Sequence, residues 1–503
     1  MEKVVGVLVG EKIFQWQIET LEKLKDSGLK IELLSVNQKE RHLNYYLKLL
    51  FFLESKILKS NFKYLKSRQV QEQIFSVNFL GNISSALSNS QKFSYIISFL
   101  QQQESEIKEI SISSNIPVIS LSAPAFPGQS LIDAISNAYK KGEILFEINL
   151  QVYKDGAKSL KYSAVSSIEA GLLLKSINAI LAKCSLIIPR FFNNNCNVFN
   201  IEVSRDINIR LDKKRGLLNA FFIHLFDKIY YKRQWILLYN FTHAQNQNPV
   251  NSFCQLLPAK INQYADPFVI THEGRQYLFL EELGFKNGKG IISYSTIGGN
   301  RISTPKKIIE SKYHMSFPNV FKYNNQFYMI PETQDDNNIQ LWRCMDFPEK
   351  WKKEKNIVDN VKAVDSIIHE INGKWWLFCS IKSLREASGH EELHIFYSDS
   401  PLSDKWLPHS GNPVISDARC GRNAGKIEYK NGKYFRYSQF SGKVYGFGIS
   451  KSEIVKISEN EYKEKLMEII YPDNSKGFYN LHSFNYDGNL VVSDAIRRIK
   501  RFL

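Results

Sequence analysis

One hairpin pattern recurs five times in the second half of the chain. Each copy is an apolar run, a tight turn and a second run rich in aromatic or β-branched residues. The turns centre on Gly274, Asn325, Gly373, Gly432 and Gly488, at intervals of 51, 48, 59 and 56 residues. Asn-Gly and similar pairs supply the positive φ angles that short hairpins need. Repeats of about fifty residues with several strands each are typical of propeller blades, so the pattern predicts a five-bladed β-propeller over residues 235–503.

A large β-sandwich with unrelated hairpins is the alternative interpretation. The 25 Tyr and 33 Phe residues fit either architecture, because aromatic rings pack well on pleated, half-buried surfaces. A sandwich, however, does not require an even interval between turns of the same kind. The spacing therefore favours the propeller.

The first part of the chain has a different period. VVGVLVG and LKIELLSVN are short apolar runs typical of buried strands, and FQWQIETLEKLKDSG between them has a helical pattern that ends at a Gly stop. The same alternation continues through IPVISLSA and the long helical pattern SSIEAGLLLKSINAILAKC. This order predicts an α/β doubly wound, Rossmann-like domain with a parallel sheet over residues 1–205. Residues 206–234 are expected to be a linker.

The net charge of +16 favours polyanionic partners such as nucleic acid, anionic lipid headgroups or phosphate-bearing substrates. We expect no nucleic acid, because no zinc-finger or RNP-type pattern occurs. The six cysteines include no C-x-x-C pair and are expected to be reduced thiols. No signal peptide and no run of eighteen apolar residues is recognised, which predicts a cytoplasmic protein. The sequence names no cofactor. Clustered carboxylates could bind Ca²⁺ or Mg²⁺ through oxygen, but no D-x-D triplet occurs and no metal ligand is assigned.

Residues 41–68 alternate Leu, Phe and Tyr with Lys and contain almost no acidic side chains. This is the pattern of a basic amphipathic helix that lies on an anionic membrane surface. A core helix with a solvated lysine face has the same pattern. The C-terminal RRIKRFL is a second, weaker candidate. The expected location is therefore cytoplasmic, with peripheral attachment at the inner membrane face.

Propeller geometry predicts where polar residues of the repeat meet. The first strand of each blade starts at the mouth where the second strand ends, so residues about eight before and seven after each turn share one end. Those positions hold Asp266, Phe317, Asp365, Ala424 and Asn480 before the turns, and Glu281, Glu332, Ser380, Gln439 and Asp494 after them. Flanking polar residues at the same end are Glu282, His314, Ser316, Arg422 and His482.

A mouth lined with carboxylates suits sugar chemistry. One carboxylate can accept a proton, and a second, kept protonated by burial, can donate one. Trp375 and Trp376 offer a possible stacking face. For any single residue the plain alternative is a local backbone cap or a solvated side chain. The set as a whole favours a sugar site.

Ordered motifs in the second half resemble a known family. ADPFVI, YLFLEE, HMSFP, YMIPET, WWLF, NPVISD and RNAGK resemble the N-terminal domain of plant glucosamine inositolphosphorylceramide transferases, which is distantly similar to family 43 glycoside hydrolases. The resemblance implies Asp266 as general base and Asp365 as the carboxylate that tunes pKa. It leaves Glu332 as the acid, although those hydrolases usually carry the acidic Glu on the third blade. This departure argues against ordinary hydrolysis.

Residues 1–205 resemble formyltransferases that use formyl-tetrahydrofolate, chiefly in IPVISLSAPAFPG. The family's Asn-x-His is replaced by Ser120-Leu121-Ser122, and Asp155 is the candidate for the family Asp. Because a serine cannot replace a catalytic imidazole, formyl transfer is not expected. The resemblance implies a scaffold or binding module.

Three function classes stay open. The first is a glycosyltransferase of cell-surface polysaccharide or glycolipid synthesis, acting on a nucleotide sugar and a glycan or glycolipid acceptor. The second is a non-catalytic glycan- or lipid-binding protein. The third is a family 43-like hydrolase, which would need export to meet its substrate. Charge, the amphipathic segment and the acidic mouth favour the transferase.

Overall fold

The computed structural model divides the chain into two compact units. The first comprises Met1–Phe199, Leu211–Leu225 and Leu384–Ser388, and the second comprises Asn200–Arg210, Phe226–Ser383 and Gly389–Leu503. The residues that the structure describes are 3–10, 12–36, 45–59, 63–69, 76–80, 92–100, 103–193, 202–203, 217–241, 253–259, 261–285, 288–298 and 301–501.

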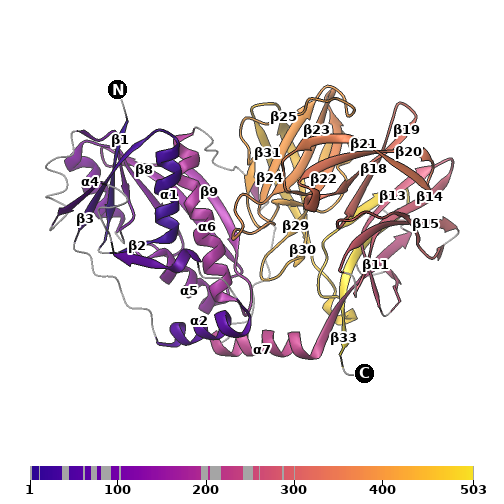
Figure 1. Cartoon of the computed structure of the whole chain (residues 1–503), viewed down its shortest axis with the longest axis horizontal. Helices are drawn as coiled ribbons and strands as arrows, with labels where there is room; N and C mark the ends of the chain where they lie inside the picture. Colours follow the sequence, from indigo (N-terminus) through magenta and orange to yellow (C-terminus); the bar gives the residue numbers. More distant parts are fainter. Residues whose placement is uncertain are drawn as a thin grey trace. The chain divides into compact units, whose positions relative to one another are not determined.

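The first unit is built on a seven-stranded sheet (Figure 1). Its strands follow the order β5-β3-β1-β6-β7-β8-β9, with bounds Ser76–Leu80, Lys30–Val36, Val4–Val9, Tyr95–Ser98, Val118–Ser122, Leu145–Lys154 and Ala157–Ser167. The first five strands are parallel, and the chain winds outward from β1 in both directions. The last two are antiparallel, so the predicted parallel sheet describes only part of this unit.

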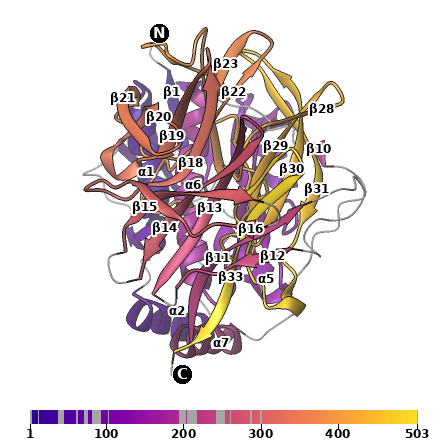
Figure 2. The same cartoon turned by 90° about the vertical axis from the view of Figure 1, so that its right-hand side faces the viewer.

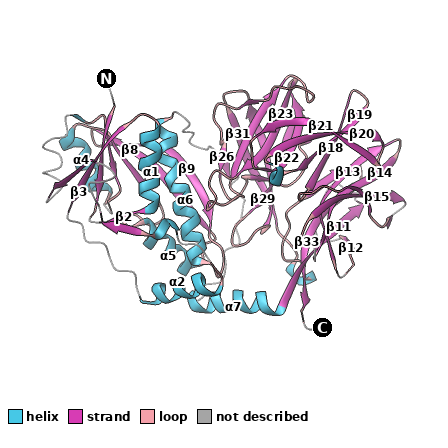
Figure 3. Ribbon diagram, in the orientation of Figure 1, coloured by secondary structure: helices cyan, strands magenta, loops and turns pink. Residues whose placement is uncertain are grey.

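Helices accompany the sheet of the first unit (Figure 3). They are α1 Gln15–Asp26, α2 Tyr45–Ile57, α4 Glu104–Ser114, α5 Leu131–Lys141, α6 Leu173–Phe192 and α7 Leu217–Tyr230, the last of which continues into the second unit after Leu225. Two short strands, β2 Lys12–Phe14 and β4 Ser67–Gln69, pair with each other and are separate from the main sheet. α6 is apolar on nearly every side and lies in the core. α7 falls inside the stretch predicted to be a linker. No helix in the described part of the chain is long and apolar enough to cross a bilayer.

The second unit consists of five sheets, which confirms the five-bladed β-propeller (Figure 2). The first three are β13–β17 (Asn262–His272, Arg275–Gly284, Gly290–Gly298, Arg301–Ile302, Lys306–Ile309), β18–β21 (Ser316–Tyr323, Gln326–Glu332, Asn338–Asp346, Lys350–Asp359) and β22–β26 (Ala363–Ile371, Lys374–Ile381, Glu392–Ser398, Leu407–Pro408, Ile415–Ser416).

The fourth and fifth sheets complete the ring. The fourth holds β27–β31 (Arg422–Asn423, Glu428–Lys430, Lys433–Phe440, Gly448–Ile457, Tyr462–Ile470) with β10 Glu202–Val203 at its edge. The fifth joins β11 Tyr231–Phe241 and β12 Cys254–Leu256 to β32 Phe484–Asp487 and β33 Leu490–Lys500. β11 pairs with β33 along its whole length, from Tyr231 opposite Lys500 to Phe241 opposite Leu490. Strands from both ends of the propeller segment therefore close the ring in one blade.

The repeated turns have the backbone conformation that their residues predicted. In the first blade Glu273 and Gly274 have φ angles of 48° and 73°, and in the third Asn372 and Gly373 have 56° and 75°. The turns at Asn325, Gly432 and Gly488 also have positive φ. Two successive residues with positive φ match the right-handed twist of the strands they join. The first four hairpins share this pair of positive φ angles, whereas the turn at Gly488 has one.

Candidate functional site

Three blades carry the same irregularity where their first strand begins. Asp266, Phe317 and Asp365 have φ angles of 50°, 47° and 48°, a region that residues other than glycine rarely adopt. The pairing register shifts at each of these points, as in a β-bulge. A β-bulge changes the direction in which the side chain of the extra residue points. At these equivalent positions of the three blades, the side chains therefore do not point as they would in a regular strand.

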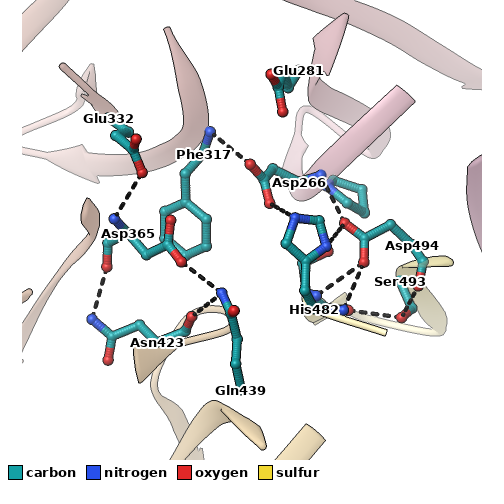
Figure 4. A network of polar contacts seen from close by, with 12 residues as sticks. Asp266, Glu281, Phe317, Glu332, Asp365, Asn423, Gln439, His482, Ser493 and Asp494 are labelled. Carbon is teal, nitrogen blue, oxygen red and sulfur yellow. Dashed lines mark hydrogen bonds and ion pairs between the residues drawn. The ribbon is translucent and has the colours of Figure 1, made fainter. Parts of the chain in front are cut away.

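The strand registers bring the two predicted sets of residues to one end of the ring. Ala265 lies opposite Glu281, Ser316 opposite Glu332, and Arg422 opposite Gln439. In the fifth blade the backbone N–H groups of His482 and Ser483 both donate to Asp494 at 3.0 Å. Figure 4 shows the resulting group. We call its five acidic members the carboxyl cluster: Asp266, Glu281, Glu332, Asp365 and Asp494.

A histidine bridges two members of the carboxyl cluster. The Nδ1 atom of His482 lies 2.7 Å from Asp494 Oδ2, and Nε2 lies 3.2 Å from Asp266 Oδ1 (Figure 4). Asp494 also accepts the backbone N–H of Asp266 at 3.0 Å, and Asp266 accepts that of Phe317 at 3.2 Å. The chain of contacts therefore links the fifth, first and second blades.

A second ion pair holds Asp365. The guanidinium of Arg422 donates from Nε to Asp365 Oδ2 at 2.5 Å and from Nη2 to Oδ1 at 3.2 Å. Gln439 donates to the same carboxylate at 2.6 Å, and Glu332 accepts the backbone N–H of Asp365 at 3.3 Å. These two donors hold the carboxylate of Asp365 in place, so Asp365 orients its neighbours.

The buried cations determine which carboxyl groups ionise easily. Burial opposes charge on His482, but the carboxylates of Asp494 and Asp266 outweigh it and raise its pKa to about 9. Burial also opposes ionisation of Asp494, yet the pairing with His482 lowers its pKa. Burial and the nearby acidic groups raise the pKa of Asp266 well above its usual value, and burial with Asp365 does the same for Glu332. One end of the ring thus holds both ionised and protonated carboxyl groups.

Glu281 is protonated at neutral pH, and its neighbour His314 is partly exposed to solvent. Burial, followed by the charges of Asp494 and Asp365, raises its pKa to about 8. His314 Nε2 lies 3.3 Å from Glu281 Oε1, while His314 Nδ1 accepts the backbone N–H of Gly290 at 2.9 Å. Burial lowers the pKa of His314, which fits a neutral ring with its proton on Nε2. The His314 side chain is 31% exposed, against 9% for Glu281, so a ligand can approach from this side.

Other predicted residues have structural roles. Glu282 faces the opposite side of β14, where it accepts from Asn262 and Ser293 within its own blade. Trp375 and Trp376 are not a stacking face of this site. They follow directly after the turn at Gly373, at the far end of β23, and Trp376 is buried and donates to the Ile371 carbonyl.

Several contributors were missed from the sequence. The Trp235 ring lies 4.0 Å from the His482 ring, and the Tyr445 ring contacts both His482 and the Arg422 guanidinium. Asn423 donates to the Asp365 carbonyl at 2.8 Å. Trp235 and Tyr445 lie outside the aligned hairpins, so the repeat gave no signal for them. Asn423 adjoins the predicted Arg422 and could have been found by strand alternation.

The comparisons with known proteins concern the propeller. Residues 247–489 match the family model for "Glucosamine inositolphosphorylceramide transferase 1, N-terminal". The curated protein named Glucosamine inositolphosphorylceramide transferase 1 from Oryza sativa subsp. japonica is 32% identical over 220 residues, and that from Arabidopsis thaliana is 34% identical over 207. These matches cover 43% and 40% of this chain, but only 29% and 27% of the relatives. The chain thus spans under a third of their length.

Among solved structures, the similarity is to glycoside hydrolases. The family 117 enzyme Zg3597 from Zobellia galactanivorans aligns with a TM-score of 0.34 and 10% identity, over 48% of this chain and 77% of that one. The GH62 α-L-arabinofuranosidase catalytic domain of Coprinopsis cinerea gives 0.34 and 14%, over 46% and 80%. These two structural similarities say nothing of the substrate of this chain.

A metal ion would compete with the ion pairs at this site. Ligand atoms of Asp266, His482 and Asp494 lie within 4.8 Å of one another. With a pKa of about 9, however, His482 carries protons on both ring nitrogens at neutral pH and presents no lone pair. Metal binding here requires the ring to lose a proton first.

The first unit has a separate cavity of about 250 Å³ at the carboxyl ends of β6 and β7. This is where doubly wound sheets bind ligands. Ser120 and Ser122 line it, and the buried hydroxyl of Ser122 has no hydrogen-bond partner among the described residues. Asp155 does not line it: this residue, with a φ angle of 51°, forms the exposed turn between β8 and β9. Asp155 is thus placed in this turn and not among the residues that line the cavity.

Proposed function

We propose that the propeller binds a carbohydrate group at the carboxyl cluster and that the chain is a carbohydrate-active transferase, acting on a glycan or glycolipid. The observation that carries this proposal is the convergence of carboxyl groups in different protonation states beside two buried cations. Paired carboxyl groups whose pKa values differ are the usual equipment for proton transfer at sugar oxygens. Sugar hydroxyls also suit such a site, because they both donate and accept hydrogen bonds.

Within the proposal, Glu281 is the group that donates a proton or hydrogen bond to the ligand. It is protonated at neutral pH, and it adjoins the exposed edge of His314. We keep Asp266 as the proposed base, and it also holds His482, whose Nε2 lies 3.2 Å from Asp266 Oδ1. Glu332, with its raised pKa, remains compatible with an acid.

The names of the relatives suggest the first ligands to test. They contain an amino sugar, glucosamine, and a phosphoinositol lipid. We propose a nucleotide sugar as donor and a phosphoinositol-headed or similar glycolipid as acceptor. The overall charge of +16 favours both, because each carries phosphate.

A donor panel tests the proposal. Purified full-length chain is mixed with nucleotide sugars, with and without a phosphoinositol lipid, and nucleotide release is measured. We expect release by the natural chain and at least about a hundredfold loss in Asp266→Asn and Glu281→Gln, which retain an acceptor oxygen and the side-chain shape. Glu370→Gln, an exposed acid on β22, is the matched control. Equal release by all four proteins would refute a catalytic carboxyl cluster.

A non-catalytic glycan-binding role is the second candidate. It is favoured by the burial of the carboxyl cluster, whose members are at most 7% exposed as whole residues and are mostly engaged with one another. Saturable binding of a glycan without turnover, lost in Asp266→Asn, would support this role. Release of free sugar from an oligosaccharide would instead support a hydrolase.

We further propose that the first unit derives from a formyltransferase-like domain that keeps its cavity but not its chemistry. Among the described residues that line the cavity, none is a histidine. We expect no formyl transfer from 5-formyl- or 10-formyltetrahydrofolate, whereas a rise in Tm with either compound would show that the cavity still binds that class of ligand.

A cytoplasmic, membrane-peripheral location also remains a proposal. Lipid binding by the full chain is its test.

A further inference from the structure

Helix α7 has two apolar faces, and only one of them is covered. Phe221 and Ala220 belong to the buried core of the first unit, with Leu218 and Leu225 packed against it. Phe222, Phe226 and Ile229 are 53%, 52% and 48% exposed. The covered face fixes the helix to this core as far as Leu225.

The exposed side chains form one continuous stripe. At 100° per residue, they fall within an arc of about 120° on the helix. They are Phe222, Ile223, Phe226, Ile229 and Tyr230, and we call them the α7 stripe. The rings of Phe226 and Tyr230 stack at 4.1 Å. Monomeric proteins rarely leave such a stripe in water, so it marks an interaction surface.

Basic residues surround the carboxyl end of the stripe. Arg233 lies opposite Arg498, and Tyr231 opposite Lys500, where β11 continues from α7. Arg501 donates its backbone N–H to the carbonyl of Tyr230. Over residues 217–233 and 496–501 the sequence has seven basic residues and one acid, Asp227. That acid is already paired with Arg233 and Arg498.

We propose that the α7 stripe and its basic end bind the surface of an anionic lipid bilayer. Aromatic and aliphatic side chains enter the headgroup boundary, Tyr230 lies at the level where tyrosine is favoured, and the lysines and arginines face the phosphates. Charge decides against a second copy of the chain as occupant. A self-paired surface would bring two basic ends together without acidic partners.

Helix α2 supplies an adjacent contribution. It lies beside the start of α7 (Figures 1 and 2), and both helices pack on the same core. Phe52 and Ile57 are 57% and 48% exposed, and Lys48 and Lys56 are also exposed. The sequence predicted membrane contact for residues 41–68, of which 41–44 and 60–62 lie outside the described residues. The structure shifts the main contact to α7.

Vesicle co-sedimentation of the full-length chain tests the proposal. The vesicles are phosphatidylcholine alone and phosphatidylcholine mixed with phosphatidylglycerol. We expect binding to the anionic vesicles that weakens as salt is raised. Phe222→Gln with Phe226→Gln should weaken it at least about tenfold, because each lost aromatic side chain contributes on the order of a kilocalorie or more of burial. Lys228→Gln with Lys500→Gln should also weaken it and reduce the salt dependence.

The controls separate the surface from general stickiness. Ile112→Gln removes an equally exposed apolar side chain, at 63%, from α4, and Lys430→Gln removes an exposed lysine from β28. Both should bind as the natural chain does, and all variants should keep its Tm. Binding unaffected by the α7 variants would overturn the proposal. So would light scattering that shows a dimer of the natural chain, dissociated by Phe226→Gln, without lipid binding.

Discussion

Neighbouring charges give the members of the carboxyl cluster different properties at the residue scale. Asp494 accepts three backbone N–H groups and pairs with His482, which lowers its pKa. For Glu281, burial and then the charges of Asp494 and Asp365 raise the pKa to about 8. The turn register predicted both positions, because counting along a hairpin fixes which residues share an end. It could not predict their charge, which depends on burial and on partners from other blades.

Replacing Glu281 with Gln should stabilise the protein in alkaline solution. The folded state holds a proton on Glu281 up to a pH of about 8, whereas the unfolded chain releases it near 4.5. The free energy of unfolding of the natural chain therefore falls as pH rises through this range. Because glutamine has no proton to release, the free energy of unfolding of Glu281→Gln does not fall in this way. The variant should therefore be more stable than the natural chain at pH 8 by roughly 3 kcal/mol.

Urea titrations at several pH values measure this difference. Glu370→Gln, which alters an exposed acid, should leave the pH profile unchanged. A Glu281→Gln profile parallel to that of the natural chain would mean that Glu281 is ionised in the folded state.

Removing the partner of His482 should destabilise the fold. Because the pKa of His482 is raised to about 9, its stabilising contribution is complete below about 6.5 and is lost as pH rises through 9. Asp494→Asn leaves the buried imidazolium with one fewer carboxylate and should cost about 3–5 kcal/mol at pH 6. The NMR titration of the His482 ring should move to lower pH in this variant. An unchanged titration would assign the raised pKa to another neighbour.

At the scale of single elements, the sequence was most informative where residue chemistry is local. Glycine and asparagine at the turns revealed five hairpins, because positive φ restricts which residues occur there. The β-bulges at Asp266 and Asp365 gave no such signal, since tertiary contacts and not residue type hold them. The sequence did not reveal helix α7 within the predicted linker, because its apolar residues lie on two faces and hide the helical period.

A glycine at a hairpin turn should be more sensitive than a glycine within a strand. A Cβ atom at Gly373 would meet nothing within 4 Å, yet the φ angle of 75° is unfavourable for alanine. Gly373→Ala should therefore lower the free energy of unfolding by about 1–2 kcal/mol. Gly284→Ala, which has equal space but no positive φ, should change it by less than about 0.5 kcal/mol. Equal losses would show that the positive φ angle at Gly373 does not set the cost.

For the whole molecule, the ring depends on one blade built from both ends of the propeller segment. β33 lies between β11 and β32, with Val492 opposite Tyr239 on one side and Asn485 on the other. Even turn spacing predicted five blades, but it could not show which strands close them. That information lies in the pairing of residues more than 240 positions apart, such as Tyr239 and Val492.

Breaking this closure should affect the entire propeller. Val492→Pro removes a backbone donor from the central strand of the closing blade and should lower the free energy of unfolding by about 3 kcal/mol or more. Lys352→Pro, on the outer strand β21, is the matched control and should cost clearly less. Denaturant unfolding followed by tryptophan fluorescence measures both. Equal destabilisation would mean that the closing blade has no special role.

The most direct test of a carbohydrate site is a crystal structure of the full chain with a glucosamine-containing saccharide. The site described above predicts ligand density at the end of the ring, with a sugar oxygen within hydrogen-bond distance of Glu281 or His314. Density only at the outer edges of the blades, or only in the cavity of the first unit, would contradict it.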